Sequence, residues 1–317
     1  MNALRGSIGR RGLLAGLGSV AVTAACAQAP QPVAVRWSSG TAQPALVAPA
    51  GAVDCHHHIY DQSYPINAAS ALRPPDATVA DYRQLQQRLR LHRHVVVQPS
   101  TYGTNNQGIM DALAAFGDEA RGIAVCDTSV TDAELDRMDK AGVRGLRFIT
   151  SIPGGVPIDM LEPLSARVAE LGWHVQLVMA GDEIAARREM LARLRSPVVF
   201  DHMGHIPQPQ GVDHPGFAVI RAMLERGRTW VKLSGAYIDS KVGPPGYADI
   251  APLAQALVAH APERLVWGSD WPHPTKPVND KPDDAALFDL LSVWAPDERV
   301  RHAILVGNPA TLYGFPV

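Results

Sequence analysis

The chain has 317 residues, a formal net charge of −2 at pH 7 and 19% charged residues. This balance excludes the strongly basic surface typical of nucleic-acid binding, and the length is enough for one large domain with a sizeable core. The three cysteines, Cys26, Cys55 and Cys126, have no CxxC spacing, so the sequence predicts neither a disulfide framework nor a thiolate zinc site.

The beginning of the chain is typical of an export signal. Arg10 and Arg11 precede an apolar stretch that ends at Ala25 and is shorter than the roughly 20 residues needed to cross a bilayer. The pattern resembles a cleavable twin-arginine signal over residues 1–29, which predicts a periplasmic protein with no membrane association after cleavage. A disordered basic extension and lipid attachment at Cys26 are the alternatives.

The rest of the chain has the pattern of a parallel α/β protein. Residues 30–50 are rich in Pro, Ala, Ser and Gln and are predicted to be a linker. Over residues 51–317, short apolar runs rich in β-branched residues alternate with longer segments at helical spacing. The predicted strands are Val53–Tyr60, His94–Thr101, Gly122–Thr128, Val143–Ile149, Trp173–Met179, Pro197–Met203, Trp230–Ala236 and Arg264–Trp271. The predicted helices include Val79–Leu89, Asn106–Phe116, Asp132–Ala141, Met160–Leu171, Phe217–Glu225 and Ile250–His260.

Eight strands in this length favour a single (β/α)8 TIM barrel, whose active site is built at the carboxyl ends of the strands. A doubly wound open sheet is the alternative, but no GxGxxG follows the first predicted strand to support it.

Polar residues lie where several predicted strands end. His56 and His58 alternate along the first strand, so both side chains point to the same face. The fourth strand carries Arg147, the sixth ends near His202, and the eighth ends near Asp270. A lone histidine on a strand is more often a hydrogen-bonded core residue, but several polar residues at the same end of a barrel predict one joint site.

Three segments are specific enough to indicate a family. They are Asp54-Cys55-His56-His57-His58, Phe200-Asp201-His202-Met203-Gly204 and Trp267-Gly268-Ser269-Asp270-Trp271-Pro272-His273-Pro274. Together they resemble the amidohydrolase superfamily, and within it the branch of the pyrone-dicarboxylate lactonase, sugar lactonases, sulfomuconolactone hydrolase and galactarolactone isomerase. The resemblance covers residues 51–317. It implies carbon–oxygen chemistry on lactone rings rather than amide hydrolysis.

The sequence leaves two interpretations of the HxH pair open. His56, His58 and Asp270 could hold a single zinc or manganese ion, because three protein ligands and a water suffice for a catalytic site. Metal-dependent members of the superfamily generally have a lysine or glutamate on strand four and a histidine ending strand five, where this chain has Arg147 and Gln176. A guanidinium is a permanent cation and does not ligate metals. The sequence therefore favours no required cofactor, with a metal-dependent hydrolase or decarboxylase as the alternative.

Without a metal, side chains must supply the chemistry. We expect Asp270 to act as general base on water while His56, His58 and His202 donate hydrogen bonds to the lactone carbonyl as it becomes an oxyanion. A helix cap is the structural alternative for Asp270. The isomerase branch resembles this chain but has an asparagine at the position of Asp270 and lacks the full HxH, so the retained groups favour hydrolysis.

The substrate is expected to be a small anionic lactone. Arg147 can bind a carboxylate or sulfonate through its guanidinium fork, with a structural ion pair as the alternative. In the pyrone-dicarboxylate lactonase, further arginines follow strands four and seven, whereas residues 149–155 and 234–239 contain none. One principal anionic group therefore fits best, as in a muconolactone, sulfomuconolactone or aldonolactone. The other candidate substrate contacts are Ser100, Tyr102, Thr104, Asn105, Gln176 and His273, although an Asn-rich loop is also typical of a plain turn.

Overall fold

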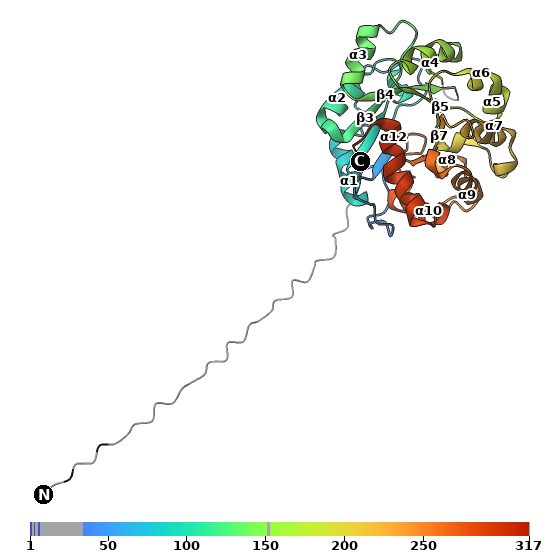
Figure 1. Cartoon of the computed structure of the whole chain (residues 1–317). Helices are drawn as coiled ribbons and strands as arrows, with labels where there is room; N and C mark the ends of the chain where they lie inside the picture. Colours follow the sequence, from blue (N-terminus) through green and yellow to red (C-terminus); the bar gives the residue numbers. More distant parts are fainter. Residues whose placement is uncertain (2, 4–5, 7–33, 151–152, 317) are drawn as a thin grey trace. The chain divides into compact units, whose positions relative to one another are not determined.

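The computed structural model describes residues 1, 3, 6, 34–150 and 153–316 (Figure 1). The predicted export signal and Cys26 lie outside the described residues, apart from residues 1, 3 and 6. The chain divides into Met1–Gln31 and one compact unit, Pro32–Val317. Within the part that is described, no helix is long and apolar enough to span a membrane.

Eight parallel strands form one sheet in the order of the sequence. They are β1 (Val53–His57), β2 (Arg93–Val97), β3 (Ala120–Ala124), β4 (Val143–Ile149), β5 (His174–Val178), β6 (Val198–Phe200), β7 (Thr229–Leu233) and β8 (Leu265–Trp267). The segment after β8 returns to β1, where Asp270 N donates to His56 O and His58 N donates to Trp271 O, both at 2.8 Å. The sheet is thus a nearly closed barrel, which confirms the predicted (β/α)8 architecture.

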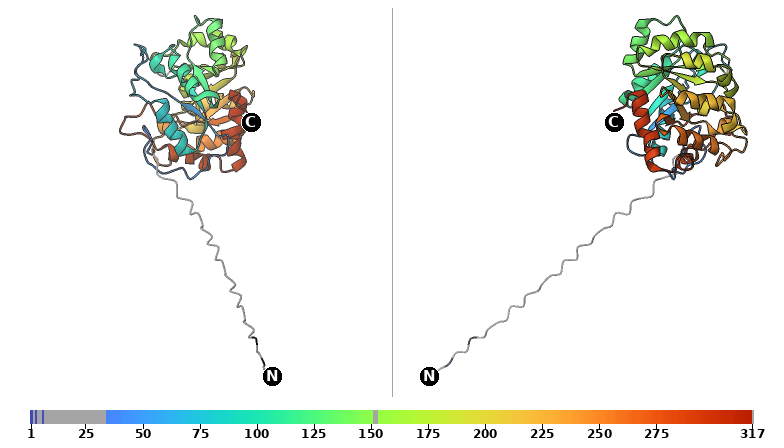
Figure 2. Two further views of the ribbon diagram at one scale, coloured as in Figure 1. Left: turned by 90° about the vertical axis from the view of Figure 1, so that its left-hand side faces the viewer. Right: turned by 45° about the vertical axis from the view of Figure 1, so that its right-hand side comes forward.

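Helices surround the strands (Figure 2). They are α1 (Val79–Leu89), α2 (Gln107–Phe116), α3 (Asp132–Lys140), α4 (Leu161–Ala169), α5 (Gly181–Ala186), α6 (Arg188–Arg193), α7 (Pro215–Leu224), α8 (Ala236–Asp239), α9 (Ala251–His260), α10 (Asp284–Trp294), α11 (Glu298–His302) and α12 (Asn308–Tyr313). The six predicted helices correspond to α1, α2, α3, α4, α7 and α9, each within two residues at either end. For α1 the start is set by a capping box, in which Thr78 and Asp81 bind each other's backbone N–H groups.

Most predicted strands extend past the observed ones at their carboxyl ends. The prediction Val53–Tyr60 ends three residues beyond β1, and Arg264–Trp271 ends four beyond β8. The backbone leaves the regular ladder there, and Asp270 adopts a left-handed φ of 62°. His58, His202 and Asp270 therefore lie on the segments that follow the strands, whereas His56 and Arg147 lie on β1 and β4 themselves.

The amino end of the barrel is closed by the end of the chain, which crosses it in Figure 1. Tyr313 of α12 and Phe315 pack against inward-facing apolar side chains such as Val53, Val97 and Val199. Residues 34–50, which lie in the predicted linker, also contact the barrel, since Arg36 O accepts a hydrogen bond from Trp271 Nε1. The candidate functional residues lie at the opposite, carboxyl end of the strands.

Candidate active site

Asp270 lies among three histidines at the carboxyl end of the barrel. Its Oδ1 is 3.5 Å from His56 Nε2, 3.4 Å from His58 Nε2 and 3.9 Å from His202 Nε2. His56 comes from β1, His58 follows it, and His202 follows β6. All four side chains are buried. The structure thus brings together the four residues that the sequence proposed as catalytic.

The backbone at two of these residues is unusual. His202 has φ 49° and Asp270 has φ 62°, both in the left-handed region that residues other than glycine rarely adopt. Such conformations are costly and cluster at functional sites. Gly235 lies beside His202 with φ 65°, and a Cβ there would approach His202 Nδ1 to 2.7 Å. This close approach requires glycine.

Tyr237 binds the second oxygen of the central carboxylate, a contact that the sequence analysis did not predict. Its hydroxyl donates to Asp270 Oδ2 at 2.5 Å, and its side chain is buried at the start of α8. Asp270 therefore has the histidines at one oxygen and a phenol at the other. The signal in the sequence is a tyrosine directly after the seventh predicted strand.

Burial determines the charge of the three histidines. It lowers the pKa of His56 and His58 below the ordinary value, and it lowers the pKa of His202 to about 4. Burial acts in the opposite sense on Asp270, but His202, His58 and His56 more than offset it, and the pKa of Asp270 lies well below its ordinary range. A carboxylate thus faces neutral imidazoles at neutral pH.

A second polar layer lies directly beneath the histidines. Lys232 of β7 is fully buried, and its Nζ is 2.6 Å from Gln176 Oε1, 3.1 Å from His56 Nδ1 and 3.4 Å from Asp201 Oδ1. Burial would raise the pKa of Asp201, but Lys232, then His56 and Arg147, hold it well below the usual range. The sequence analysis missed Lys232, although a lysine inside the apolar run of a barrel strand is a rare and detectable signal.

Arg147 lies at the edge of this layer, on β4. Its Nε is 3.4 Å from Asp201 Oδ2, and its Nη1 donates to Gln98 O at 3.2 Å. Ser100, also a predicted substrate contact, has a buried Oγ with no hydrogen-bond partner among the described residues. An unpaired buried hydroxyl costs free energy unless a ligand or water satisfies it.

Three other predicted contacts line a cavity of about 450 Å³ formed by neighbouring loops, and none of the four catalytic candidates lines it. These residues are Tyr102, Thr104 and Asn105. The hydroxyl of Tyr102 donates to Asp61 O and accepts from Asp61 N, while Asn105 Oδ1 accepts from the backbone at the start of α2. The Tyr102 hydroxyl and Asn105 Oδ1 are thus bonded within the protein.

Gln176 and His273 lie behind the site rather than at its surface. Gln176 is fully buried and donates through Nε2 to Asp201 Oδ2 at 2.9 Å. His273 is also fully buried, with Nε2 3.1 Å from Asp284 Oδ2 and its ring edge-on to Tyr237. Both predicted substrate contacts are therefore bound to protein groups that support the site.

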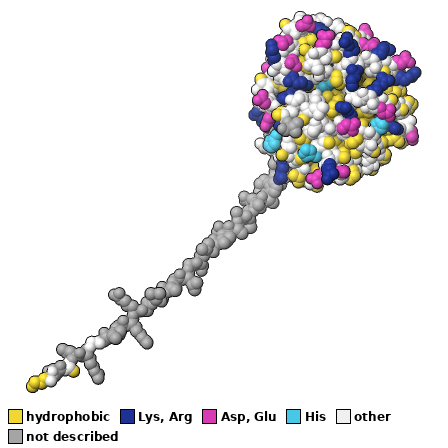
Figure 3. Space-filling view, in the orientation of Figure 1, with side chains coloured by type: hydrophobic (Ala, Val, Ile, Leu, Met, Phe, Trp, Pro, Cys, Tyr) yellow, Lys and Arg dark blue, Asp and Glu magenta, His cyan; other side chains and the backbone are white. Residues whose placement is uncertain are grey.

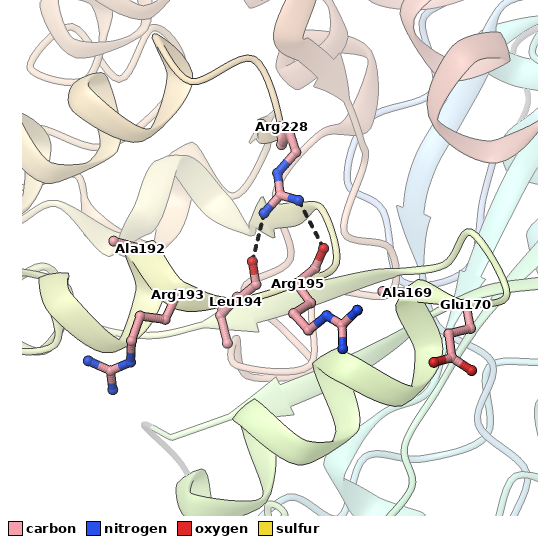
Figure 4. Close-up of a pocket in the computed structure, with 7 residues that line it drawn as sticks. All are labelled: Ala169, Glu170, Ala192, Arg193, Leu194, Arg195 and Arg228. Atoms are coloured by element: carbon pink, nitrogen blue, oxygen red, sulfur yellow. Dashed lines mark hydrogen bonds between the residues drawn. The ribbon is translucent and has the colours of Figure 1, made fainter.

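A different hollow, of about 350 Å³, is drawn in Figure 4. Arg228 lines it and donates to the carbonyl groups of Leu194 and Arg195. These residues precede β6 and β7, so the hollow lies at the amino end of the strands, opposite the carboxylate and histidines. Across the face shown in Figure 3, acidic and basic side chains are interspersed.

One group of residues could hold a metal ion. His56, His202 and Asp270 offer ligand atoms that lie within 4.8 Å of one another. His56 Nε2 and His58 Nε2 are 3.3 Å apart, a separation that a tetrahedral zinc would also accommodate.

The barrel and its centre of one carboxylate and three histidines define a class of barrel enzymes that act from the carboxyl ends of the strands. The sequence matches the amidohydrolase family over residues 53–315, and the chain belongs to this family.

Named relatives are similar over most of their length. The chain is 35% identical to a 2-pyrone-4,6-dicarboxylate hydrolase of Comamonas testosteroni over 87% of this chain and 94% of that protein. It is 35% identical to the D-galactarolactone isomerase of Agrobacterium fabrum, covering 88% and 96%, and 34% identical to the 4-sulfomuconolactone hydrolase of Rhizobium radiobacter, covering 84% and 91%. A crystal structure of an Agrobacterium tumefaciens protein superposes with a TM-score of 0.82 at 33% identity, covering 89% of this chain and 99% of that one.

Proposed function

We propose that the protein hydrolyses the ester bond of a small anionic lactone of the muconolactone, sulfomuconolactone or aldonolactone type. The single observation that carries this proposal is the carboxyl group of Asp270 held between the hydroxyl of Tyr237 and the imidazoles of His56 and His58. The relatives named as lactone hydrolases support the reaction class. A carboxylate beside neutral imidazoles is suited to take a proton from water and to stabilise a developing oxyanion.

The proposed reaction balances with one water. Asp270 accepts a proton as the water oxygen bonds to the lactone carbonyl carbon, and His56 and His202 stabilise the resulting oxyanion through hydrogen bonds. Collapse of the tetrahedral intermediate breaks the ring carbon–oxygen bond, and the departing oxygen takes the proton from Asp270. The product is a hydroxy acid whose new carboxyl group ionises, so each turnover releases one proton at neutral pH.

Recognition of the substrate's anionic group is assigned to Arg147, with Ser100 as a further contact. Asp201 lies 3.4 Å from both Lys232 and Arg147, so one carboxylate faces two cations and one positive charge is left for an anionic substrate; Arg147, at the edge of this layer, is placed to provide it. A guanidinium binds carboxylates and sulfonates through paired N–H groups. Absence of further arginines in residues 149–155 and 234–239 favours a substrate with one such group.

The contacts of His56 do not fit a resident divalent ion. A histidine that ligates a metal usually donates its other N–H to a carboxylate, carbonyl or water. Here an ammonium, Lys232 Nζ, lies 3.1 Å from His56 Nδ1, and Arg147 adds a second cation to this layer. We therefore propose turnover without a required metal. A metal-dependent hydrolase remains the second candidate because of the ligand spacing at His56, His202 and Asp270. Near-stoichiometric zinc or manganese in active protein, with loss of turnover on chelation, would establish that candidate instead.

The test of function is turnover of a panel of anionic lactones, followed by proton release. We expect at least one lactone to open, and Asp270→Asn to lower kcat by at least about 100-fold because general base catalysis contributes that much. Asp159→Asn, at an exposed aspartate outside the site, is the matched control and should keep full activity. A decrease in kcat of less than about tenfold in Asp270→Asn would show that Asp270 is not the general base.

An isotopic measurement separates hydrolysis from isomerisation, the activity in the name of one relative. Hydrolysis in ¹⁸O-labelled water places one label in the new carboxyl group, whereas ring migration consumes no water. Product lacking the label would assign this chain to isomerisation.

We also propose that residues 1–29 direct export to the periplasm and are removed. The support is the Arg10-Arg11 pair followed by an apolar stretch. Replacement of both arginines by lysine should retain the protein in the cytoplasm, and sequencing of the mature protein from the periplasm identifies the cleavage site. Unchanged export of the lysine variant would contradict a twin-arginine signal.

A further inference from the structure

Lys232 is a buried charge that the proposed mechanism does not use. It lies in the middle of β7, fully buried, with its ammonium pointing at the underside of the HxH pair. Burying an ammonium costs free energy unless it is paired and fully hydrogen-bonded. Its Nζ lies at hydrogen-bond geometry to Gln176 Oε1 and His56 Nδ1, and Asp201 Oδ1 at 3.4 Å supplies the opposite charge.

The neighbours of Lys232 determine which nitrogen of His56 carries the proton. Gln176 presents its carbonyl oxygen to Lys232 because its amide nitrogen donates to Asp201 Oδ2. An ammonium has donors and no acceptor, so His56 Nδ1 can only accept a hydrogen bond from it. A neutral imidazole that accepts at Nδ1 carries its proton at Nε2, the atom that faces Asp270.

Asp201 offers a competing partner to the same nitrogen. Its Oδ1 is 3.3 Å from His56 Nδ1, yet across the described ranges of the chain this oxygen makes no hydrogen bond of acceptable geometry. The contact from Lys232 is both shorter and properly aligned. The geometry therefore favours Lys232 as the partner of His56 Nδ1.

His58 has the opposite arrangement. Its Nδ1 lies 2.7 Å from Val97 O, and a carbonyl only accepts, so Nδ1 carries the proton and Nε2 of the neutral ring has a free lone pair. The Nε2 atoms of His56 and His58 are 3.3 Å apart. With a proton on His56 Nε2 this is a donor facing an acceptor. With both protons on Nδ1, the two Nε2 lone pairs and Asp270 Oδ1 would face one another with no proton among them, an arrangement that needs a cation.

We propose that Lys232 is a positioning residue that holds His56 as a hydrogen-bond donor at Nε2, so that the two histidines of the HxH pair have different functions. His56 donates to the lactone carbonyl, and His58 accepts at Nε2, for example from the attacking water. This differs from the expectation that both histidines donate. The catalytic consequence rests on the proposed lactone hydrolysis, whereas the arrangement of protons does not.

The direct test is ¹⁵N NMR of the protein labelled in histidine, without substrate. The variant His56→Gln identifies the signals of His56. We expect an unprotonated Nδ1 and a protonated Nε2 at His56, with the reverse at His58. A protonated Nδ1 at His56 overturns the proposal, whether or not the protein opens any lactone. Failure to find a lactone substrate would overturn the proposed function and leave this measurement intact.

The variant Lys232→Met removes the charge with little change in length. Its His56 should shift its proton to Nδ1 and donate to Asp201, which leaves two free lone pairs at the HxH pair. We expect zinc, added alone, to bind at least about tenfold more tightly than to the wild type, because partners of a histidine ligand alter metal affinity by that factor. An unchanged tautomer or unchanged zinc affinity in a folded variant overturns the proposal.

Kinetics give a third measurement. Lys232→Met should lower kcat by about 10- to 100-fold while KM stays within about twofold, because a transition-state donor is lost rather than a binding group. Lys140→Met, at an exposed lysine of α3, is the matched control. Equal changes in the two variants, or a change confined to KM, would contradict a positioning function.

Discussion

The two oxygens of Asp270 are held by different partners, and this asymmetry orients the proposed base. Oδ1 faces the three histidines, while Oδ2 accepts a hydrogen bond from Tyr237 at 2.5 Å. The left-handed backbone at Asp270 makes the carboxylate depend on such contacts for its position. Tyr237 is itself fixed by the ring of His273, which packs edge-on against it.

Removal of this phenol hydroxyl should therefore disorder the base. We expect Tyr237→Phe to lower kcat by about 10- to 100-fold with little change in KM, because a hydrogen bond to a charged group contributes about 1.5–3 kcal/mol. The measurement is steady-state lactone hydrolysis. Tyr64→Phe removes a similar hydroxyl–carboxylate bond, to Asp111 at the surface, and should leave kcat unchanged. Equal kcat in Tyr237→Phe and the wild type would show that Asp270 is positioned without this contact.

Individual site residues that belong to a sequence motif could be predicted, whereas those outside a motif could not. His56, His58, His202 and Asp270 were predicted from their spacing and from family resemblance, and the structure places them together. Lys232 and Tyr237 lie on β7 and α8 without a motif. Their function depends on which side chains face them across the barrel, and a single sequence does not specify those pairings.

The junction between β1 and the segment after β8 is the element on which the site depends. Asp54 joins the two sides, since Oδ1 accepts from Ser269 N and Oδ2 accepts from Ser269 Oγ and from Tyr82 OH of α1. Asp270 follows directly, and His56 lies opposite it on β1. The same hydrogen bonds that close the barrel thus set the distance between the proposed base and the HxH pair.

Gly268 allows this close approach. A Cβ at this position would lie 2.6 Å from His56 Cβ and 2.9 Å from His56 N, so Gly268→Ala must force β1 and β8 apart. We expect it to lower the free energy of unfolding by about 1–3 kcal/mol, the usual cost of overpacking, and to reduce activity as well. Urea denaturation measures the first effect.

Gly246→Ala is the matched control, because a Cβ at Gly246 meets open space. It should leave both stability and activity unchanged. If Gly268→Ala were as stable as the wild type, the junction would be looser than these distances imply.

Periodicity predicted the elements well where they are regular and less well where they end. The prediction for β4, Val143–Ile149, matches the structure at both ends, because that strand is buried at every position except Arg144. The predictions for β1 and β8 run too far, since tertiary hydrogen bonds rather than local propensity determine where these strands leave the ladder. The short helices α5, α6 and α8 have too few turns to show a clear period.

At the scale of the whole molecule, the barrel buries many ionisable groups, and this should make stability depend on pH. Burial lowers the pKa of both His94 and His174 to about 3, compared with an ordinary value of 6.5. As the pH falls below 6.5, the unfolded chain binds protons that the folded chain excludes. Each of these histidines therefore lowers the free energy of unfolding by about 1.4 kcal/mol per pH unit over this range. Above pH 6.5 these histidines are neutral in both the folded and the unfolded chain, so they do not lower the free energy of unfolding there.

Asp54 has the opposite effect, because burial raises its pKa from 3.8 to about 6. Between these values the folded chain binds the proton first, so stability from this group increases as the pH falls. His94 and His174 alone outweigh this carboxyl group, and the other buried histidines with a lowered pKa act in the same direction, so we expect the free energy of unfolding to be at least about 3 kcal/mol lower at pH 5 than at pH 7. Urea denaturation at pH 5 and at pH 7 measures this difference.

His94→Gln should reduce the pH dependence of the free energy of unfolding by about 1.4 kcal/mol per pH unit, whereas His302→Gln, at an exposed histidine, should not change it. Stability that stays constant or increases between pH 7 and pH 5 would mean that the buried histidines become protonated within the folded barrel.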